Sequence, residues 1–482
     1  MTAWFEVWWP YLATATLALV ELVAASHAVL NKREVRAATA WVGMILLVPG
    51  IGVLLYLLLG INRIDRLARR TRGDMRRYEH ATQPAVGADQ LESRLVPADA
   101  HLAEIARTID RTSRWPLLPG NRIAMLRDGD ETYPEMLRCI AAAERSIALV
   151  SYIFDNDAAG RRFVDALAAA RERGVEVRVL IDDAGARYSW PAIDRMLRQR
   201  GVSVARFLRV LAPWSAAFAN LRNHRKILVV DGTIGFTGGM NIRHECVLSE
   251  TPRHPTRDLH FRVEGPVVTQ LMDVFAEDWT FATREVLAGE RWFPALPPIG
   301  DAFARAISDG PDRDLDCMRW ALHGAIASAR RSVRVVTPYF LPDEPLITAL
   351  NVAALRGVDV DLLLPHRGNL RIVNWAMRGE LWKVLHHGCR VWLTPPPFDH
   401  SKIMVVDGAW TLLGSANWDP RSLRLNFELG VECYDRDLAA KIDGFVDERI
   451  ATAARLDAAL LASVRWPTRL RDSTARLFSP YL

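Results

Sequence analysis

One pattern of residues occurs twice in this chain with every spacer identical, His-x-Lys-x4-Asp-x6-Gly-(Gly/Ser)-x-Asn. The copies are His224, Lys226, Asp231, Gly238, Gly239 and Asn241, and His400, Lys402, Asp407, Gly414, Ser415 and Asn417. The sequence holds 12 His but only five Lys. Chance placement would give about 0.1 of a single His-x-Lys pair before the other positions are considered. The repeat therefore indicates one active site assembled from two halves.

The residue types in the repeat suit transfer of a phosphoryl group on a phosphodiester. Each His-x-Lys precedes a run of apolar β-formers, at 227–230 and 403–406, which predicts a strand that aims His and Lys at the same face. One neutral His can attack phosphorus while the other, protonated, donates to the leaving oxygen. The lysines and asparagines would stabilise charge on the equatorial oxygens. No carboxylate cluster of metal-binding type accompanies the motifs, so we expect no metal and no cofactor.

Carboxylates near the motifs are expected to orient the histidines. A nucleophilic His needs an acceptor that fixes its tautomer, and we assign Glu428 to His400 and Asp258 to His224. We include the motif residues Asp231 and Asp407 in the site, but we expect them to make structural pairs at strand ends rather than to touch substrate.

The small residues Gly239 and Ser415 stand at equivalent positions of the two motifs. For both we expect either support of the backbone or contact with the phosphate. The asparagines Asn241 and Asn417 are expected to return beside the lysines after the glycine turn.

Two apolar stretches, at 11–30 and 37–61, open the chain. Each is long enough to span a hydrocarbon layer of about 30 Å, which predicts a two-helix transmembrane hairpin over residues 1–62. A cleavable signal peptide is the competing interpretation. No Lys or Arg precedes the first stretch and a second follows at once, which favours the hairpin.

The positive charges on the two sides of this hairpin predict opposite orientations. Seven arginines between positions 63 and 77 place the large C-terminal part in the cytoplasm, at the inner membrane of a bacterial cell. The loop between the stretches then exposes Lys32, Arg33 and Arg36 on the far side. A shallow re-entrant hairpin would remove the conflict. Glu21 and His27, inside the first stretch, are costly to bury singly.

The rest of the chain predicts an α/β fold with two homologous lobes. Residues 63–120 are expected to form a basic juxtamembrane connector, 121–295 the first lobe and 312–482 the second, with a linker rich in Pro and Gly between 287 and 313. The stretch 146–154 matches 332–340. The net charge of +5 comes almost entirely from Arg, which suits phosphate-bearing partners. Five scattered cysteines indicate reduced, buried thiols.

At these residues the sequence resembles the phospholipase D superfamily, and over nearly its whole length it resembles the bacterial cardiolipin synthases. The resemblance is carried by the stretches 223–226, 238–241, 257–266 and 415–428. It implies two phospholipase D-like lobes packed together, each a mixed β-sheet flanked by helices. It also implies transfer of a phosphatidyl group from one phosphatidylglycerol to a second, with a phosphatidyl intermediate on His224 and His400 as acid and base.

Other functions stay open on the residues alone. A phospholipase D that hydrolyses phospholipid and a synthase that takes phosphatidylethanolamine as donor would use the same motifs. A membrane-tethered phosphodiesterase or nuclease is favoured by the Arg-rich composition, whereas the hairpin argues against nucleic acid as a partner. A non-catalytic membrane scaffold is disfavoured because both motifs are intact. We expect phosphatidylglycerol and anionic membrane lipids as partners.

Overall fold

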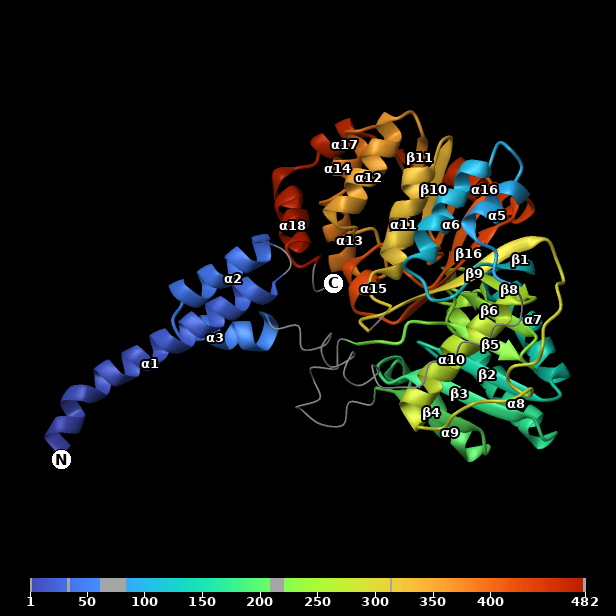
Figure 1. Ribbon diagram of the computed structural model, residues 1–482, viewed down its shortest axis with the longest axis horizontal. Helices are drawn as coiled ribbons and strands as arrows, with labels where there is room; N and C mark the ends of the chain where they lie inside the picture. The colour runs from blue at the N-terminus through green and yellow to red at the C-terminus, as the bar shows by residue number, and fades with distance from the viewer. Residues whose placement is uncertain (1, 33–34, 61–83, 209–220, 313, 480–482) are drawn as a thin grey trace. The chain divides into compact units, whose positions relative to one another are not determined.

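The computed structural model describes residues 2–32, 35–60, 84–208, 221–312 and 314–479 (Figure 1). The chain divides into two compact units, Met1–Leu67 and Ala68–Leu482. The first unit holds the apolar stretches and the second holds both copies of the repeated motif. The arginines of the expected connector at 63–77, and Arg33, lie outside the described residues.

Helix α1 (Thr2–Asn31) contains the segment Trp8–Asn31, which is long and apolar enough to cross a membrane. The second apolar stretch was expected to be one span, but it forms α2 (Val35–Leu47), α3 (Ile51–Leu55) and a π-helical turn at Tyr56–Gly60. The break falls at Pro49 and Gly50, residues that interrupt a helix. The expected pair of spans is thus confirmed only in part, because α1 alone among the described helices has a spanning length.

A single mixed sheet runs through the second unit, and its strand order repeats about its centre. Outward on one side the strands are β1 (Leu118–Arg127), β8 (Leu259–Glu264), β6 (Ile234–Gly238), β5 (Ile227–Val230), β2 (Ser146–Ser151), β3 (Glu176–Asp182) and β4 (Ser203–Phe207). Outward on the other they are β9 (Ala302–Asp309), β16 (Glu428–Tyr434), β15 (Trp410–Gly414), β14 (Ile403–Val406), β10 (Ser332–Val336), β11 (Asp359–Pro365), β12 (Arg390–Thr394) and β17 (Ala454–Leu456). Each side is one lobe. The expected two homologous lobes are therefore observed, joined edge to edge where β1 pairs with β9.

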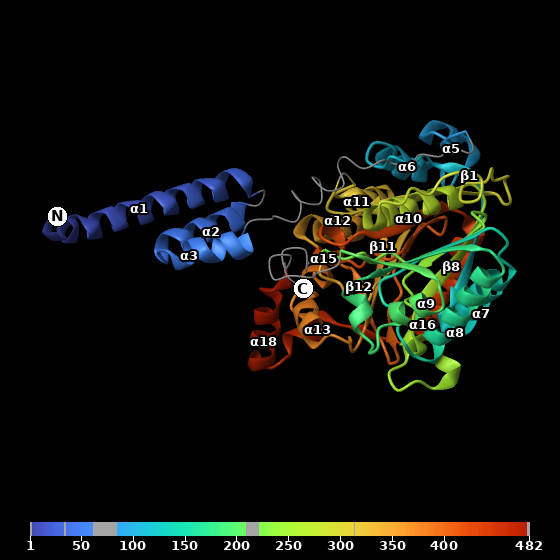
Figure 2. The ribbon, with the colours of Figure 1, turned by 90° about the horizontal axis from the view of Figure 1, so that it is seen from below.

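Helices cover both faces of this sheet, in an arrangement that changes sides between the lobes (Figure 2). In the first lobe α7 (Asp128–Ala142) and α8 (Ala158–Glu172) lie on one face and α10 (Val267–Thr283) on the other. In the second lobe α11 (Cys317–Ser328) and α12 (Glu344–Leu355) share the face of α10, and α16 (Arg436–Thr452) shares the face of α7. The remaining helices are α9 (Ile193–Gln199), α13 (Arg371–Arg378), α14 (Trp382–Leu385), α15 (Pro420–Arg424), α17 (Ala458–Ala462) and α18 (Trp466–Arg476). Strands β5 and β14 are buried on both faces, which explains their continuous apolar sequences.

Two segments differ from their expected roles. The part of the connector that the structure describes forms α5 (Ala88–Arg94) and α6 (Ala103–Asp110), whose apolar faces join the core of the second lobe. Leu91, Leu102 and Ile105 are fully buried there. The linker contains β9, a buried central strand that is paired on both edges. Proline and glycine flank that strand and concealed it in the sequence.

The motif aspartates hold the starts of two strands. Asp231 accepts backbone N–H groups from Glu144, Arg145 and Ser146 at the start of β2. Asp407 accepts those of Arg330, Arg331 and Ser332 at the start of β10, and His101 Nε2 lies 2.6 Å from its carboxylate. These are structural pairs at strand ends, as the sequence indicated. Six residues of largely extended chain stand between each aspartate and the histidine of its motif, which separates them by roughly 20 Å.

Replacement of Asp407 by Asn should therefore lower stability without disabling the site. We expect Asp407→Asn to lose about 2 kcal/mol in urea unfolding, because a buried carboxylate that accepts several amide hydrogens is replaced by a neutral carbonyl. The folded fraction should keep its turnover. Asp447→Asn removes a carboxylate that is paired with Arg334 and 62% exposed, and should change stability by less than about 0.5 kcal/mol. Loss of turnover at unchanged stability in Asp407→Asn would contradict this assignment.

Candidate active site

The backbone at each motif histidine pairs with a short segment of the other lobe. Strand β7 (Thr256–Arg257) pairs in parallel with β13 (Phe398–Asp399), and His400 N donates to Arg257 O at 2.8 Å. Asn223 forms a matching bridge with Phe427, and His224 N donates to Phe427 O at 2.9 Å. Both histidines are thereby fixed at the seam between the lobes.

The crossing decides which carboxylate serves which histidine. His224 Nδ1 lies 3.0 Å from Glu428 Oε1, and His400 Nδ1 lies 2.8 Å from Asp258 Oδ2. The sequence identified the right carboxylates, but the expected pairing of Glu428 with His400 and Asp258 with His224 is wrong. Glu428 directly follows the residue that bridges to the His224 segment, and Asp258 directly follows the residue that bridges to the His400 segment. Each imidazole is consequently oriented by the opposite lobe.

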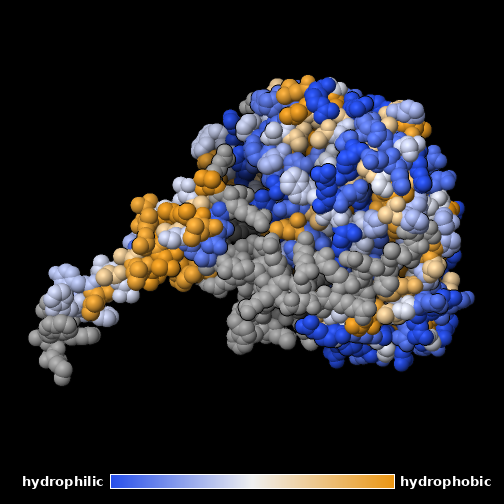
Figure 3. Space-filling model, viewed as in Figure 1, coloured by the Kyte–Doolittle hydropathy of each residue, from blue (hydrophilic) through white to orange (hydrophobic). Residues whose placement is uncertain are grey.

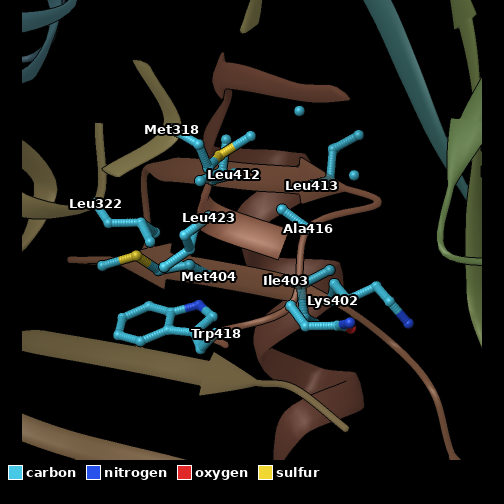
Figure 4. A pocket seen from close by; sticks show the side chains of 13 residues that line it. Met318, Leu322, Lys402, Ile403, Met404, Leu412, Leu413, Ala416, Trp418 and Leu423 are labelled. Carbon is cyan, nitrogen blue, oxygen red and sulfur yellow. The ribbon is translucent and has the colours of Figure 1, made fainter. Parts of the chain in front are cut away.

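The two motif lysines lie deep in the same site. Lys226 is 2% exposed and Lys402 is 5% exposed. Lys226 Nζ donates to His224 O at 2.5 Å, and Lys402 Nζ donates to His400 O. Lys402 also lines a pocket whose other walls are mainly apolar, and its side chain extends away from Trp418 and Met404 (Figure 4). Each lysine is thus tied to the backbone of its own histidine within a poorly hydrated environment.

The two asparagines are both buried. Asn241 Oδ1 accepts the N–H of Ile153 at 3.0 Å, which fixes the carboxamide by its oxygen and leaves its amino group as the part that can donate to a ligand. Asn417 lines the pocket of Lys402 and donates through Nδ2 to Ser422 Oγ at 3.2 Å. Asn417 thus lies beside the lysine of its own motif, as expected, whereas the return of Asn241 beside Lys226 stays a prediction.

The difference between Ser415 and Gly239 is matched by the difference between the two carboxylates. Ser415 Oγ donates to Glu428 and accepts the N–H of Leu429 at 3.0 Å. In the first lobe the Asp258 carboxylate itself accepts the next amide, Leu259 N, at 2.8 Å. A Cβ at Gly239 would lie 2.4 Å from Asp258 Oδ1, so a side chain there would clash. The shorter carboxylate takes the place of the serine hydroxyl, and glycine makes the room.

Burial lowers the pKa of the basic side chains in the site. It lowers the pKa of Lys226 to about 7 and that of Lys402 to about 8, although Glu428 and Asp258 act in the opposite direction. It also lowers the pKa of both histidines, and the two lysines add to each shift; the pKa of His400 falls further, because Glu428 opposes the shift only at His224. Without an anion in the site, the imidazoles are therefore neutral near pH 7.

The pKa values of the two carboxylates shift in opposite directions. Burial raises the pKa of Asp258 to about 8, and the neighbouring Asp399 adds to the shift against the attraction of Lys402. Burial acts on Glu428 as well, but His224 and Lys226 outweigh it and hold the pKa of Glu428 below its usual value. At neutral pH Glu428 is ionised, whereas the Asp258–His400 pair retains one proton.

Aromatic rings beside the histidines were missed by the sequence prediction. The Tyr152 ring centroid is 4.9 Å from that of His224, and Lys226 Nζ lies 5.6 Å from the Tyr152 ring. Tyr339 and Phe398 lie 6.4 Å and 5.9 Å from His400. Both tyrosines belong to the matched stretches 146–154 and 332–340, which could have drawn attention to them. Among the residues that the structure describes, no group of three or more His, Cys, Asp or Glu is placed to hold a metal ion.

The shifted pKa values predict a bell-shaped dependence of kcat/KM on pH. The acid limb should lie below 6.5, since His224 must be neutral to attack and burial lowers its pKa. The alkaline limb should fall between about 7 and 8, where Lys226 and Lys402 lose their charge and the Asp258 pair loses its proton. In kcat the alkaline limb should move upward, because a bound phosphate stabilises the ammonium groups. A kcat/KM that stays level from pH 6 to pH 9.5 would contradict it.

Comparison with known proteins relates this geometry to a family. A family model described as "Cardiolipin synthase, PLD-like domain" matches residues 136–279 and 322–449. A second, described as "Phospholipase_D-nuclease N-terminal", matches residues 17–60. Cardiolipin synthase A of Pseudomonas fluorescens is 32% identical over 97% of this chain and 97% of its own. Cardiolipin synthase A of Pseudomonas aeruginosa is 33% identical over 95% of this chain and 94% of its own.

The fold has a counterpart among solved structures. The phosphatidylserine synthase of Haemophilus influenzae superposes with a TM-score of 0.61 at 15% identity, covering 79% of this chain and 100% of that protein. That likeness establishes the fold, and the identity of 32–33% over nearly the whole chain with the Pseudomonas proteins establishes the family. The chain belongs to the cardiolipin synthase family of phospholipase D-like proteins.

Proposed function

We propose that this protein is a cardiolipin synthase, a phosphatidyltransferase that moves a phosphatidyl group from one phosphatidylglycerol to another and releases glycerol. The observation that carries the proposal is the pair of buried histidines, each hydrogen-bonded through Nδ1 to a carboxylate of the opposite lobe. Such a pair suits a two-step transfer through a covalent intermediate. The full-length similarity to cardiolipin synthases supports the choice of lipid substrates.

In the first step His224 is the nucleophile. Ionised Glu428 accepts the Nδ1–H of His224, which leaves the lone pair of Nε2 for attack. Nε2 bonds to the phosphorus of the first phosphatidylglycerol, and the bond from phosphorus to the headgroup glycerol oxygen breaks. The negative Glu428 then stabilises the charged phosphohistidine. Lys226, Lys402 and the asparagines donate to the phosphate oxygens.

His400 acts as the acid in that step. Protonated Asp258 donates to Nδ1 of His400, so that Nε2 carries the hydrogen that faces the leaving group. Nε2 gives this proton to the departing glycerol oxygen while the Asp258 proton moves to Nδ1. In the second step His400 removes a proton from a headgroup hydroxyl of the second phosphatidylglycerol. That oxygen attacks phosphorus, and the phosphorus–nitrogen bond to His224 breaks.

We further propose that the N-terminal unit anchors the enzyme in a bacterial inner membrane with the lobes facing the cytoplasm, where they act on anionic lipids. The arginines at 63–77 support this orientation. The C-terminal helix α18 and the residues after it expose Trp466, Leu470, Leu477 and Phe478 among arginines, a surface suited to an anionic bilayer. The lobes proposed as catalytic halves are 121–295 and 312–482, with β9 completing the sheet between them.

The reaction is tested by incubation of the detergent-solubilised protein with phosphatidylglycerol in the presence of a chelator, with products followed by mass spectrometry. We expect cardiolipin and glycerol in equal amounts. Phosphatidic acid as the main product would identify a hydrolase, and cardiolipin only after addition of phosphatidylethanolamine would change the donor. Cleavage of a DNA oligonucleotide with no lipid product would identify the nuclease, and inactivation by the chelator would contradict the proposed chemistry.

The roles of the two histidines are tested with an activated leaving group. Phosphatidyl-p-nitrophenol releases nitrophenolate, which needs no proton from an acid. His400→Ala and Asp258→Asn should therefore still release a burst of nitrophenolate, although each should lose at least about 10³-fold with phosphatidylglycerol. His224→Ala and Glu428→Gln should show no burst with either substrate. The opposite pattern would exchange the nucleophile and the acid.

A further inference from the structure

The chain reverses direction between α2 and α3. Gly52 packs directly on the backbone of α2, where an added Cβ would lie 2.1 Å from Met44 O. Further along, the Tyr56 ring lies 5.4 Å from that of Trp41. As residue numbers rise in α3 their partners in α2 fall, so the two helices are antiparallel. The chain therefore returns by Tyr56 to the level of Trp41, about halfway along α2.

Helix lengths separate one spanning helix from a shorter hairpin. The apolar segment Trp8–Asn31 has 24 residues, about 36 Å of helix, which exceeds a hydrocarbon core of about 30 Å. Helix α2 has 13 residues, about 20 Å, and cannot cross that core before the chain turns. Apolar side chains gather over α2, α3 and the adjoining part of α1 (Figure 3). These lengths suit a hairpin whose tip reaches only the middle of a bilayer.

Two polar side chains of α1 form hydrogen bonds with the segment from Gly50 to Tyr56. Glu21 Oε1 accepts the N–H of Gly50 at 3.2 Å, at the tip where α3 begins. His27 Nδ1 lies 2.7 Å from Tyr56 Oη, near the other end of α3. Backbone groups at a helix start have no intrahelical partner, and hydrocarbon supplies none. A carboxylate that is costly inside a membrane thus has a structural reason to stand at position 21.

A re-entrant hairpin would also place every early cation on one side of the membrane. No Lys or Arg occurs in residues 1–31, whereas Lys32, Arg33 and Arg36 follow directly and seven arginines occur at 63–77. With two spans these groups fall on opposite sides of the membrane. With a re-entrant hairpin they fall on the same side, which the positive-inside tendency identifies as the cytoplasm.

We propose that the N-terminal unit crosses the membrane once, along α1, and that α2 and α3 form a re-entrant hairpin in the cytoplasmic leaflet. The N-terminus lies outside the cytoplasm, and the end of α1 at Asn31 and the start of α2 at Val35 lie on the cytoplasmic side together with the chain after Gly60. This topology concerns the bilayer as the partner of the unit and holds whichever reaction the lobes catalyse.

Single cysteines introduced into the full chain test this topology. All five native cysteines are buried and unpaired, so the native chain supplies the background. Thr2→Cys, Asn31→Cys, Val48→Cys and Asp74→Cys variants that retain the activity of the native chain are treated in bacterial spheroplasts with a membrane-impermeant maleimide. Labelling is then repeated after permeabilisation and after denaturation.

We expect Thr2→Cys to be labelled in intact spheroplasts, and Asn31→Cys and Asp74→Cys only after permeabilisation. Val48→Cys, at the tip, should be labelled only after denaturation. Labelling of Asn31→Cys in intact spheroplasts would overturn the re-entrant hairpin in favour of two spans, and labelling of Val48→Cys there would show that the tip crosses the bilayer. Protection of Thr2→Cys would overturn the single crossing along α1.

Discussion

The candidate active site depends on backbone pairings that cross from one lobe to the other immediately before each histidine–carboxylate pair. The bridge between Asn223 and Phe427 sets His224 against Glu428, and the pairing of β7 with β13 sets His400 against Asp258. A hydrogen bond between an imidazole and a carboxylate is sensitive to a shift of a few tenths of an ångström. The continuous sheet through β1 and β9 supplies the rigidity for both contacts at once. The lobes are thus joined in two ways. The continuous sheet fixes the distance between them, and the short backbone pairings position each histidine against its carboxylate.

The chemistry of the site follows from how deeply it is buried. Two lysines in one poorly hydrated pocket repel each other and lose hydration, which is why burial depresses the pKa of both. An entering phosphodiester restores what burial removed, since its negative charge stabilises the ammonium groups. Because Lys226 and Lys402 donate to the backbone carbonyls of the histidines, their heads are positioned before the substrate arrives. The lysines are therefore fully charged only when the negatively charged phosphate is bound.

The sequence predicted much of this arrangement, for identifiable reasons. Identical spacing in the two copies pointed to His224, His400 and their lysines, and the apolar runs after them predicted β5 and β14. The partner of each histidine was misassigned because proximity in the chain was taken for proximity in space, whereas the pairings Asn223–Phe427 and β7–β13 are long-range. The same limit applies to β9, whose central position depends on partners from both lobes. In the N-terminal unit, composition gave the apolar stretches, but Pro49 and Gly50 marked a reversal that a hydropathy pattern does not register.

The contrast between Gly239 with Asp258 and Ser415 with Glu428 bears on how such a site can evolve. A symmetric dimer of identical half-sized subunits would present the same small residue and the same carboxylate on both sides. Its two histidines would be indistinguishable until a substrate bound in one of two orientations. Covalent fusion of the halves removes that constraint, because each half can then vary without a matching change in the other half. One chain with unlike halves can therefore assign a direction to the reaction before any lipid enters.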